Sequence, residues 1–206
     1  MQAAWKLIEA NYPTIFANGC GAHVLNLLVK DILEINEYEK TLQEAVDITK
    51  FIKSRGALGK VFRTIQASLS CKRFLSLSVK TRWYTQYHCV KNVLDNRETL
   101  TLICLQTTLV KKYSGLDCEQ FIAHVRVDDF WIRLENLANI LKPVCDGIGL
   151  MEKDNCVASD IYRLFLSLLA EPVFKKNQAI LDLINERWNF LHNIFDRALV
   201  KALTED

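Results

Sequence analysis

The sequence predicts a mainly α-helical protein, with one short strand between two helices near the start of the chain. Three observations support this fold class. Only 7 glycines and 3 prolines interrupt the 206 residues, which favours long helices over an all-β fold. Half of the residues are hydrophobic and 24% are charged, as is typical of folded globular proteins. Apolar residues recur at helical spacing through most of the chain after residue 36.

The beginning of the chain predicts a helix, a strand and a second helix. Residues 1–12 have apolar side chains on one helical face, and 14–20 (TIFANGC) form a strand-like stretch. Glycines on both sides of Cys20 predict a turn there. The helix that starts at Ala22 is apolar on nearly all sides, which predicts that it is buried. This order is typical of the end of an α/β unit.

The middle of the chain predicts several helices and one extended segment. A helix over 38–55 is expected to end at Gly56 and Gly59, and another continues over 60–69. Serine alternates with apolar residues between 74 and 79, which indicates an extended segment. A helix is expected to begin near Thr81, with an antiparallel neighbour over 101–113.

The last third of the chain predicts three more helices. Asp128 is a suitable N-cap for a long helix that reaches Ile148, with a kink at Pro143. Ser159 is expected to cap the next helix, which ends before Pro172. A final helix is expected over roughly 174–203.

Cysteine usage and hydropathy indicate an intracellular protein that is not secreted. The seven cysteines are scattered and odd in number, as expected for reduced thiols rather than a disulfide framework. No apolar stretch reaches the roughly 18 residues that a membrane-spanning helix needs, and the start of the chain does not read as a signal peptide. We therefore expect no membrane partner.

Charge is strongly segregated along the chain. Residues 50–112 contain thirteen lysines and arginines but only two acids, Asp95 and Glu98, whereas the two flanks together carry a net charge of −9. A block of this kind repels itself unless an anionic partner or the acidic flanks offset it. Two interpretations follow: a surface that faces nucleic acid, or a basic face that docks on the protein's own acidic helices.

Cys20 and His23 form an isolated C-x-x-H pair. A structural zinc site needs four ligands, and the best second pair, His88 and Cys89, consists of adjacent residues that point about 100° apart on a helix. No Asp or Asn signature accompanies Cys20 and His23 to support a nucleophilic pair. The sequence therefore predicts no metal site, and the pair is consistent with the start of a buried helix.

An Arg-Trp pair lies within the basic block, in KTRWYTQY (80–87). An aromatic ring among cations can stack on an unpaired base while the cations hold phosphates. A tryptophan at a helix start is also common as a core anchor. The candidate DNA-contacting residues are Arg82, Trp83, Lys80, Lys72, Arg73 and Lys91.

The two motifs in this order resemble the hAT superfamily of DNA transposases and the genes domesticated from them. CGAHVLNL (20–27) is followed some sixty residues later by TRWY (81–84), and 130–169 is similar to the helical stretch that follows these motifs in many members. The resemblance implies a ribonuclease-H-like α/β core interrupted by an all-helical insertion. Residues 1–36 would then be the edge of that core, and 37–206 an insertion-type domain.

The resemblance also implies roles for the motif residues. Cys20 and His23 would lie beside the active site, and Trp83, with Arg82 beside it, would stack on a base flipped out during hairpin formation. The family cuts DNA with three carboxylates that hold two divalent metal ions, Mg or Mn. Two of these aspartates would precede Met1, and no glutamate in this chain matches the third position.

We therefore expect a truncated or domesticated transposase domain without catalytic residues or a bound cofactor, and not an enzyme by itself. DNA is the expected partner, self-association is a further expectation, and the resemblance implies the nucleus, with the cytoplasm as the alternative. The alternative function is that of a helical module for protein–protein interaction or dimerisation.

Overall fold

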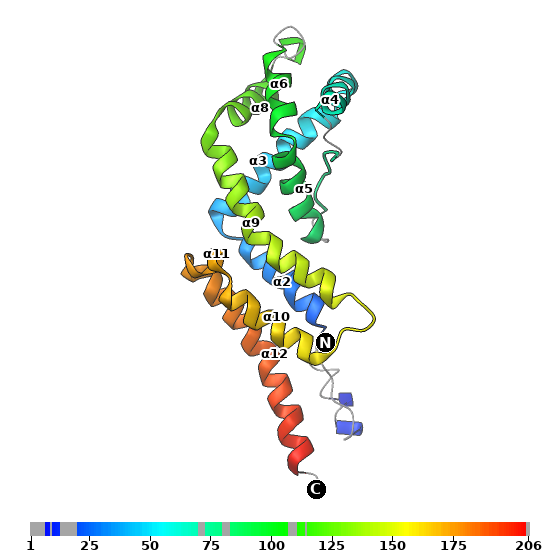
Figure 1. The fold of residues 1–206 in the computed structure, drawn as a ribbon, viewed down its shortest axis with the longest axis vertical. Helices are drawn as coiled ribbons and strands as arrows, with labels where there is room; N and C mark the ends of the chain where they lie inside the picture. The colour runs from blue at the N-terminus through cyan, green and yellow to red at the C-terminus, as the bar shows by residue number, and fades with distance from the viewer. Residues whose placement is uncertain are drawn as a thin grey trace. The chain divides into compact units, whose positions relative to one another are not determined.

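The computed structural model describes the chain at residues 7–8, 10–12, 20–69, 73–79, 83–106, 111–113 and 115–204. Helices dominate these residues (Figure 1), and apart from an isolated β-bridge at Val79 none of them has β-structure. The prediction of a mainly α-helical protein is therefore confirmed. The strand expected at 14–20 falls almost wholly outside the described residues, so the ribonuclease-H-like core edge stays a prediction.

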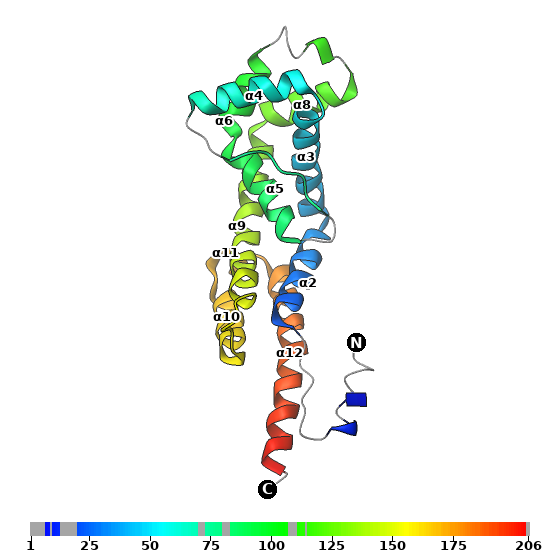
Figure 2. The same ribbon diagram turned by 90° about the vertical axis from the view of Figure 1, so that its right-hand side faces the viewer.

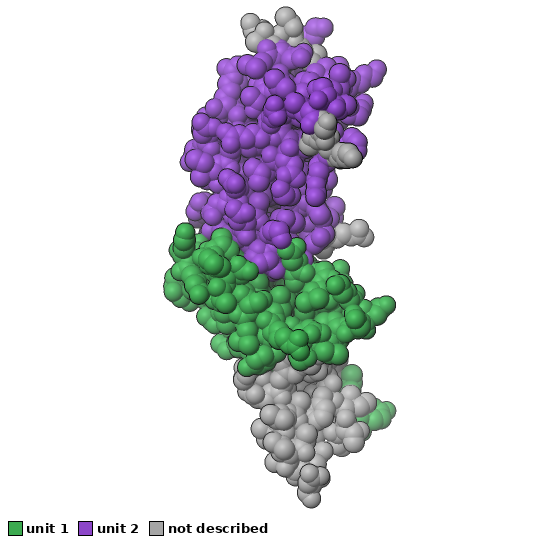
Figure 3. All heavy atoms as spheres, viewed as in Figure 1, with its two compact units in different colours: residues 1–28, 146–206 green, residues 29–145 purple. Residues whose placement is uncertain are grey.

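The described helices follow one another along the chain. Their bounds are α2 (Gly21–Leu33), α3 (Asn36–Lys53), α4 (Gly56–Ser68), α5 (Trp83–Asp95), α6 (Arg97–Leu105), the 3-10 turn η1 (Lys111–Tyr113), α8 (Leu116–Arg126), α9 (Asp128–Met151), α10 (Ala158–Ala170), α11 (Pro172–Lys175) and α12 (Gln178–Thr204). The chain forms two compact units, coloured separately in Figure 3. Unit 1 contains residues 1–28 and 146–206, and unit 2 contains residues 29–145. The sequence-based division into residues 1–36 and 37–206 describes the expected evolutionary origin of the two parts, and it stays a prediction.

In unit 2, α3 is the central helix and packs against α4, α5 and α8. Apolar residues at positions three and four apart bury one broad side of α3. Ile48, Phe51 and Ile52 are almost completely buried there. Phe51 stacks on Phe121 of α8 with 4.5 Å between the ring centroids, so a specific aromatic contact reinforces the apolar packing between these helices.

A largely buried ion pair also connects the helices of unit 2. Arg133 of α9 lies 2.9 Å from a carboxylate oxygen of Glu44 of α3, and it donates a hydrogen bond of 2.9 Å to Thr41 Oγ1. Its Nε contacts Asp129 at 2.8 Å. The buried Trp131 donates from its indole N–H to the Val125 carbonyl at 2.9 Å. These polar contacts fix the first half of α9 within unit 2, because a buried polar group is stable only with its partner.

In unit 1, α10, α11 and α12 pack against one another. Trp188 of α12 lies against Tyr162 and Phe165 of α10, with ring centroids 4.9 Å and 5.4 Å apart. The last turns of α9 approach α10 closely at Gly147, where an added Cβ would lie 2.7 Å from a methyl group of Leu164. The absence of a side chain at Gly147 therefore permits this packing.

The structure confirms the buried helix from Ala22 and corrects several element boundaries. Val24, Leu25, Leu28, Val29 and Ile32 of α2 are buried. The two glycines do not act together as a break, because α4 begins at Gly56 and includes Gly59, whose N–H donates to the Arg55 carbonyl at 2.9 Å. The helix expected over 101–113 is α6, which starts at Arg97 and ends at Leu105.

Both expected N-caps in the last third lie inside their helices. Asp128 is the first residue of α9, where its negative charge interacts favourably with the positive end of the helix dipole. Ser159 lies in the first turn of α10, and the Val157 N–H is satisfied instead by Asp160 Oδ2 at 3.0 Å. Pro143 lies within α9 without ending it.

Candidate nucleic-acid interface

Residues 73–79 form an extended segment that runs antiparallel along α5, as Figures 1 and 2 show. We call these residues the 73–79 segment. The extended conformation matches the sequence prediction for residues 74–79. Contacts at both ends and in the middle fix its register: Arg73 Nε with Asp95 Oδ2 at 3.6 Å, Ser76 Oγ with Asn92 Nδ2 at 2.9 Å, and the Val79 N–H with Thr85 Oγ1 at 2.8 Å. Side chains of α5 therefore replace the strand partner that an extended segment normally has.

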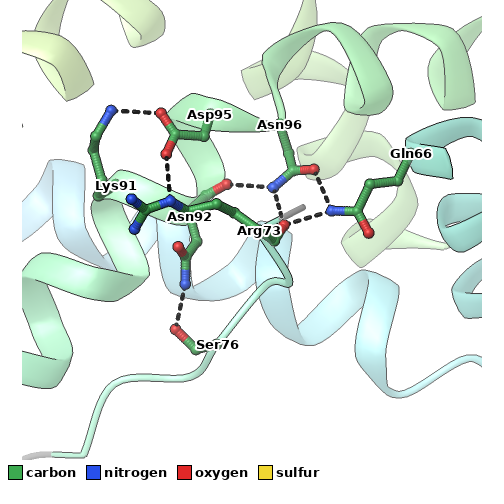
Figure 4. A network of polar contacts seen from close by, with 7 residues as sticks. All are labelled: Gln66, Arg73, Ser76, Lys91, Asn92, Asp95 and Asn96. Atoms are coloured by element: carbon green, nitrogen blue, oxygen red, sulfur yellow. Dashed lines mark hydrogen bonds and ion pairs between the residues drawn. The ribbon is translucent and has the colours of Figure 1, made fainter. Parts of the chain in front are cut away.

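Two buried amide side chains clamp the start of the 73–79 segment (Figure 4). Asn96 is fully buried, and its Nδ2 donates to the Arg73 carbonyl at 2.7 Å and to the Asn92 carbonyl at 2.8 Å. Gln66 of α4 donates to Asn96 Oδ1 at 2.9 Å and also to the Arg73 carbonyl. Because buried polar groups are costly without partners, this network holds the backbone at residue 73 in one place.

The network brings two of the predicted DNA-contacting residues together. Arg73 and Lys91 both pair with the carboxylate of Asp95 (Figure 4). The Arg73 side chain is 58% exposed, whereas that of Lys91 is 34% exposed. Two cations share one anion, so this group keeps a net positive charge that is accessible mainly at Arg73.

The first turns of α5 carry an aromatic cluster. Tyr84 meets the His88 ring edge-on with centroids 4.5 Å apart, and Tyr87 lies 5.7 Å from the same ring. Burial lowers the pKa of His88, and the positive charge of Arg73 lowers it further. Both effects favour the neutral form of the His88 ring.

The other predicted contact residues are only partly described. Lys72, Lys80 and Arg82 lie outside the described residues. Trp83 is the first residue of α5, and its side chain likewise lies outside them. The structure thus places the start of α5, at Trp83, four positions after Val79, the residue that Thr85 anchors.

The C-x-x-H pair is in unit 1, at the start of α2. Cys20 directly precedes the helix and His23 lies in its first turn, and both residues are exposed. Throughout the residues that the structure describes, no group of three His, Cys, Asp or Glu side chains is placed to hold a metal ion. The role of Cys20 and His23 beside an active site stays a prediction.

Two cations of the basic block contact acids from the C-terminal acidic flank. Arg55 lies 3.3 Å from Asp117, and Arg97 lies 2.6 Å from Asp128. Arg97 also covers the Trp131 ring, with its guanidinium carbon 5.2 Å from the ring centroid. The acidic flank therefore offsets part of the basic block within unit 2, which is the intramolecular interpretation of the charge pattern.

Sequence reasoning missed Gln66 and Asn96, the two amides of the clamp. Asn96 follows α5 directly and precedes α6, a position where asparagine usually indicates a turn or a helix cap. Gln66 reads as a surface residue of a helix that also carries lysine and arginine. No local pattern indicates that these side chains are buried, because their partner is a carbonyl on a different element.

Comparison with known families gives one match. Residues 19–120, about half of the chain, match the family described as the ZBED1 RNase-like helical domain, which derives from hAT transposases. No curated protein and no solved structure matches the chain. Among the described residues, no helix is both long and apolar enough to span a membrane. The matched region contains the C-x-x-H pair, the 73–79 segment and the Arg-Trp motif, and this similarity supports a hAT-related origin for the chain.

Proposed function

We propose that this chain is a hAT-derived helical domain that binds DNA through the 73–79 segment and the start of α5. The observation that carries the proposal is the clamp on Arg73. It fixes an extended segment with an exposed cation directly before the Arg-Trp motif. A surface that is held in place before binding loses less conformational entropy when it contacts a phosphate backbone.

In this proposal Trp83 stacks on a base that is extruded from the duplex, and Arg82 and Lys80 contact the adjacent phosphates. Extruding a base costs a few kcal/mol, and an aromatic surface offsets part of that cost. The resemblance to hAT transposases supports this role for Trp83. The proposal assigns DNA binding and base stacking to this chain, and it includes no cleavage step.

Binding to hairpin-ended and intact duplex DNA at several salt concentrations tests the proposal. Affinity is expected to fall steeply with salt, because each phosphate contact releases a counterion. Trp83→Ala is expected to weaken binding to hairpin-ended DNA by about tenfold and to affect the intact duplex much less. Equal losses on both substrates would indicate that Trp83 is only a core residue.

A matched pair of charge variants separates a local contact from a general effect of net charge. Lys80→Ala with Arg82→Ala removes two positive charges beside Trp83. Lys175→Ala with Lys176→Ala removes two exposed positive charges from unit 1. Only the first variant is expected to reduce the slope of affinity against salt. Equal reductions, or no binding by the native chain at low ionic strength, would contradict the proposal.

A second candidate function is protein–protein interaction or dimerisation. The ion pairs of Arg55 with Asp117 and of Arg97 with Asp128 favour it, because these cations are already offset within unit 2. Sedimentation velocity over a range of protein concentrations distinguishes the two functions. Salt-independent self-association without DNA binding would support the second candidate.

A further inference from the structure

Phe74 is a large aromatic side chain that the structure holds in solvent. It is 66% exposed, although both of its neighbours in the chain are fixed. The carbonyl of Arg73 is bonded by Asn96 and Gln66. On the other side Leu75 is buried, and its carbonyl accepts a hydrogen bond from Lys53 Nζ at 3.3 Å. The backbone is therefore held on both sides of Phe74, and the burial of Leu75 leaves the Phe74 side chain directed to solvent.

Further exposed rings and apolar side chains lie on the 73–79 segment and on α5. Leu77 and Val79 of the 73–79 segment are 41% and 48% exposed, and Tyr84 of α5 is 42% exposed. Tyr84 is itself supported edge-on by His88. Because the segment runs antiparallel to α5, Phe74 lies toward one end of this surface and Tyr84 toward the other.

The charge around these side chains is complementary to a polyanion. Arg73 precedes Phe74 and keeps an exposed guanidinium, even though it shares Asp95 with Lys91. In sequence, Lys72 and Lys80 flank the segment on its two sides. An exposed aromatic ring among cations fits a nucleic acid whose bases present their faces, as they do in a single strand but not inside a duplex.

We propose that this surface binds single-stranded DNA, with Phe74 stacking on an unpaired base and Arg73 contacting an adjacent phosphate. This inference rests on the proposed DNA-binding function and names the form of DNA that is bound. It assigns a stacking role to Phe74 in addition to the role proposed for Trp83.

Fluorescence anisotropy with the full chain tests this inference. The probes are an oligothymidine strand of about 20 nucleotides and a duplex of the same length. A strand of this length is sufficient, because one stacking surface contacts only a few bases. Phe74→Ala is expected to weaken single-strand binding by about five- to a hundredfold and duplex binding by less than about twofold. Phe74→Trp is expected to keep the affinity, whereas Phe74→Leu loses it because leucine has no π-face.

Ile132→Ala is the matched control, because Ile132 is 65% exposed on α9 of the same unit. It is expected to leave both affinities unchanged. An unchanged thermal unfolding midpoint for Phe74→Ala checks that the variant is folded, as expected for an exposed side chain.

The outcomes separate this inference from the proposed function. Salt-dependent duplex binding with no effect of Phe74→Ala on the single strand would overturn the inference and leave the proposed function standing. Native affinity in Phe74→Leu would also overturn it, since it would show an apolar contact of the kind a protein partner makes rather than stacking. No binding of either probe at low ionic strength would contradict both proposals.

Discussion

Asn96 is the residue on which the attachment of the 73–79 segment depends most directly. Its side chain donates to the carbonyls of Arg73 and Asn92 and accepts a hydrogen bond from Gln66. Asn96→Ala leaves these buried groups with fewer partners, at about 1–3 kcal/mol for each group that stays unsatisfied. We expect the free energy of unfolding to fall by about 2–3 kcal/mol in urea denaturation.

Gln43→Ala is the control for this prediction. Gln43 is an exposed amide of α3 that donates to Asp47 within the same helix. Its removal is expected to change the free energy of unfolding by less than about 0.5 kcal/mol. A similarly small change for Asn96→Ala would show that the clamp does not stabilise the segment.

Cys104 gives the protein a pH dependence at alkaline pH. Burial raises the pKa of the Cys104 thiol from 9.0 to about 11. The unfolded chain therefore releases this proton at lower pH than the folded chain does. The corresponding stability is fully present below pH 9 and is lost as the pH rises through 11.

The free energy of unfolding is expected to fall by at most about 1.4 kcal/mol per pH unit because of Cys104. Urea denaturation at several pH values between 9 and 11 measures this fall, with Cys104→Ala as the comparison. Burial also raises the pKa of Cys89 and of Cys118, so the variant is expected to show a shallower fall rather than none. Identical slopes for the two proteins would contradict the assignment to Cys104.

At the scale of the elements, the last turns of α9 contain two glycines with different surroundings. An added Cβ at Gly147 would lie 2.7 Å from Leu164 Cδ2 and 3.3 Å from the buried Leu25. At Gly149 it would meet no atom within 4 Å. Alanine favours a helix over glycine by up to about 1 kcal/mol at both positions, but at Gly147 this gain opposes a steric cost.

We therefore expect Gly147→Ala to be less stable than Gly149→Ala by about 1–2 kcal/mol. Urea denaturation followed by circular dichroism measures the difference between the two variants. Equal stabilities would mean that Leu164 moves aside at little cost. Gly149→Ala serves as the control, because it differs only in the space around the new methyl group.

The elements that the sequence predicts best are those with strong apolar periodicity. The burial of α2 and the length of α9 follow from such patterns. Helix ends are less predictable, because they depend on contacts that local patterns do not contain. Gly59, for example, is compatible with both a break and a first helical turn, and the hydrogen bond to Arg55 decides between them.

At the scale of the whole molecule, the charge pattern predicts that the basic block needs a partner but not which partner. Arg55 and Asp117 are 62 positions apart, and Arg97 and Asp128 are 31 positions apart. Only the folded chain brings such residues together. The sequence identifies the cations of the candidate site, but the clamp that positions Arg73 depends on tertiary structure.

The clamp has a consequence for the order of folding. Its hydrogen bonds join residues 23 and 30 positions apart, from Asn96 to Arg73 and from Gln66 to Asn96. Contacts between distant residues must overcome the entropy of loop closure, and here α4 and α5 have to be in place first. We therefore expect the 73–79 segment to dock late in folding, after α4 and α5 have formed. The candidate interface is thus a product of tertiary assembly, and an unfolded chain with the same cations lacks it.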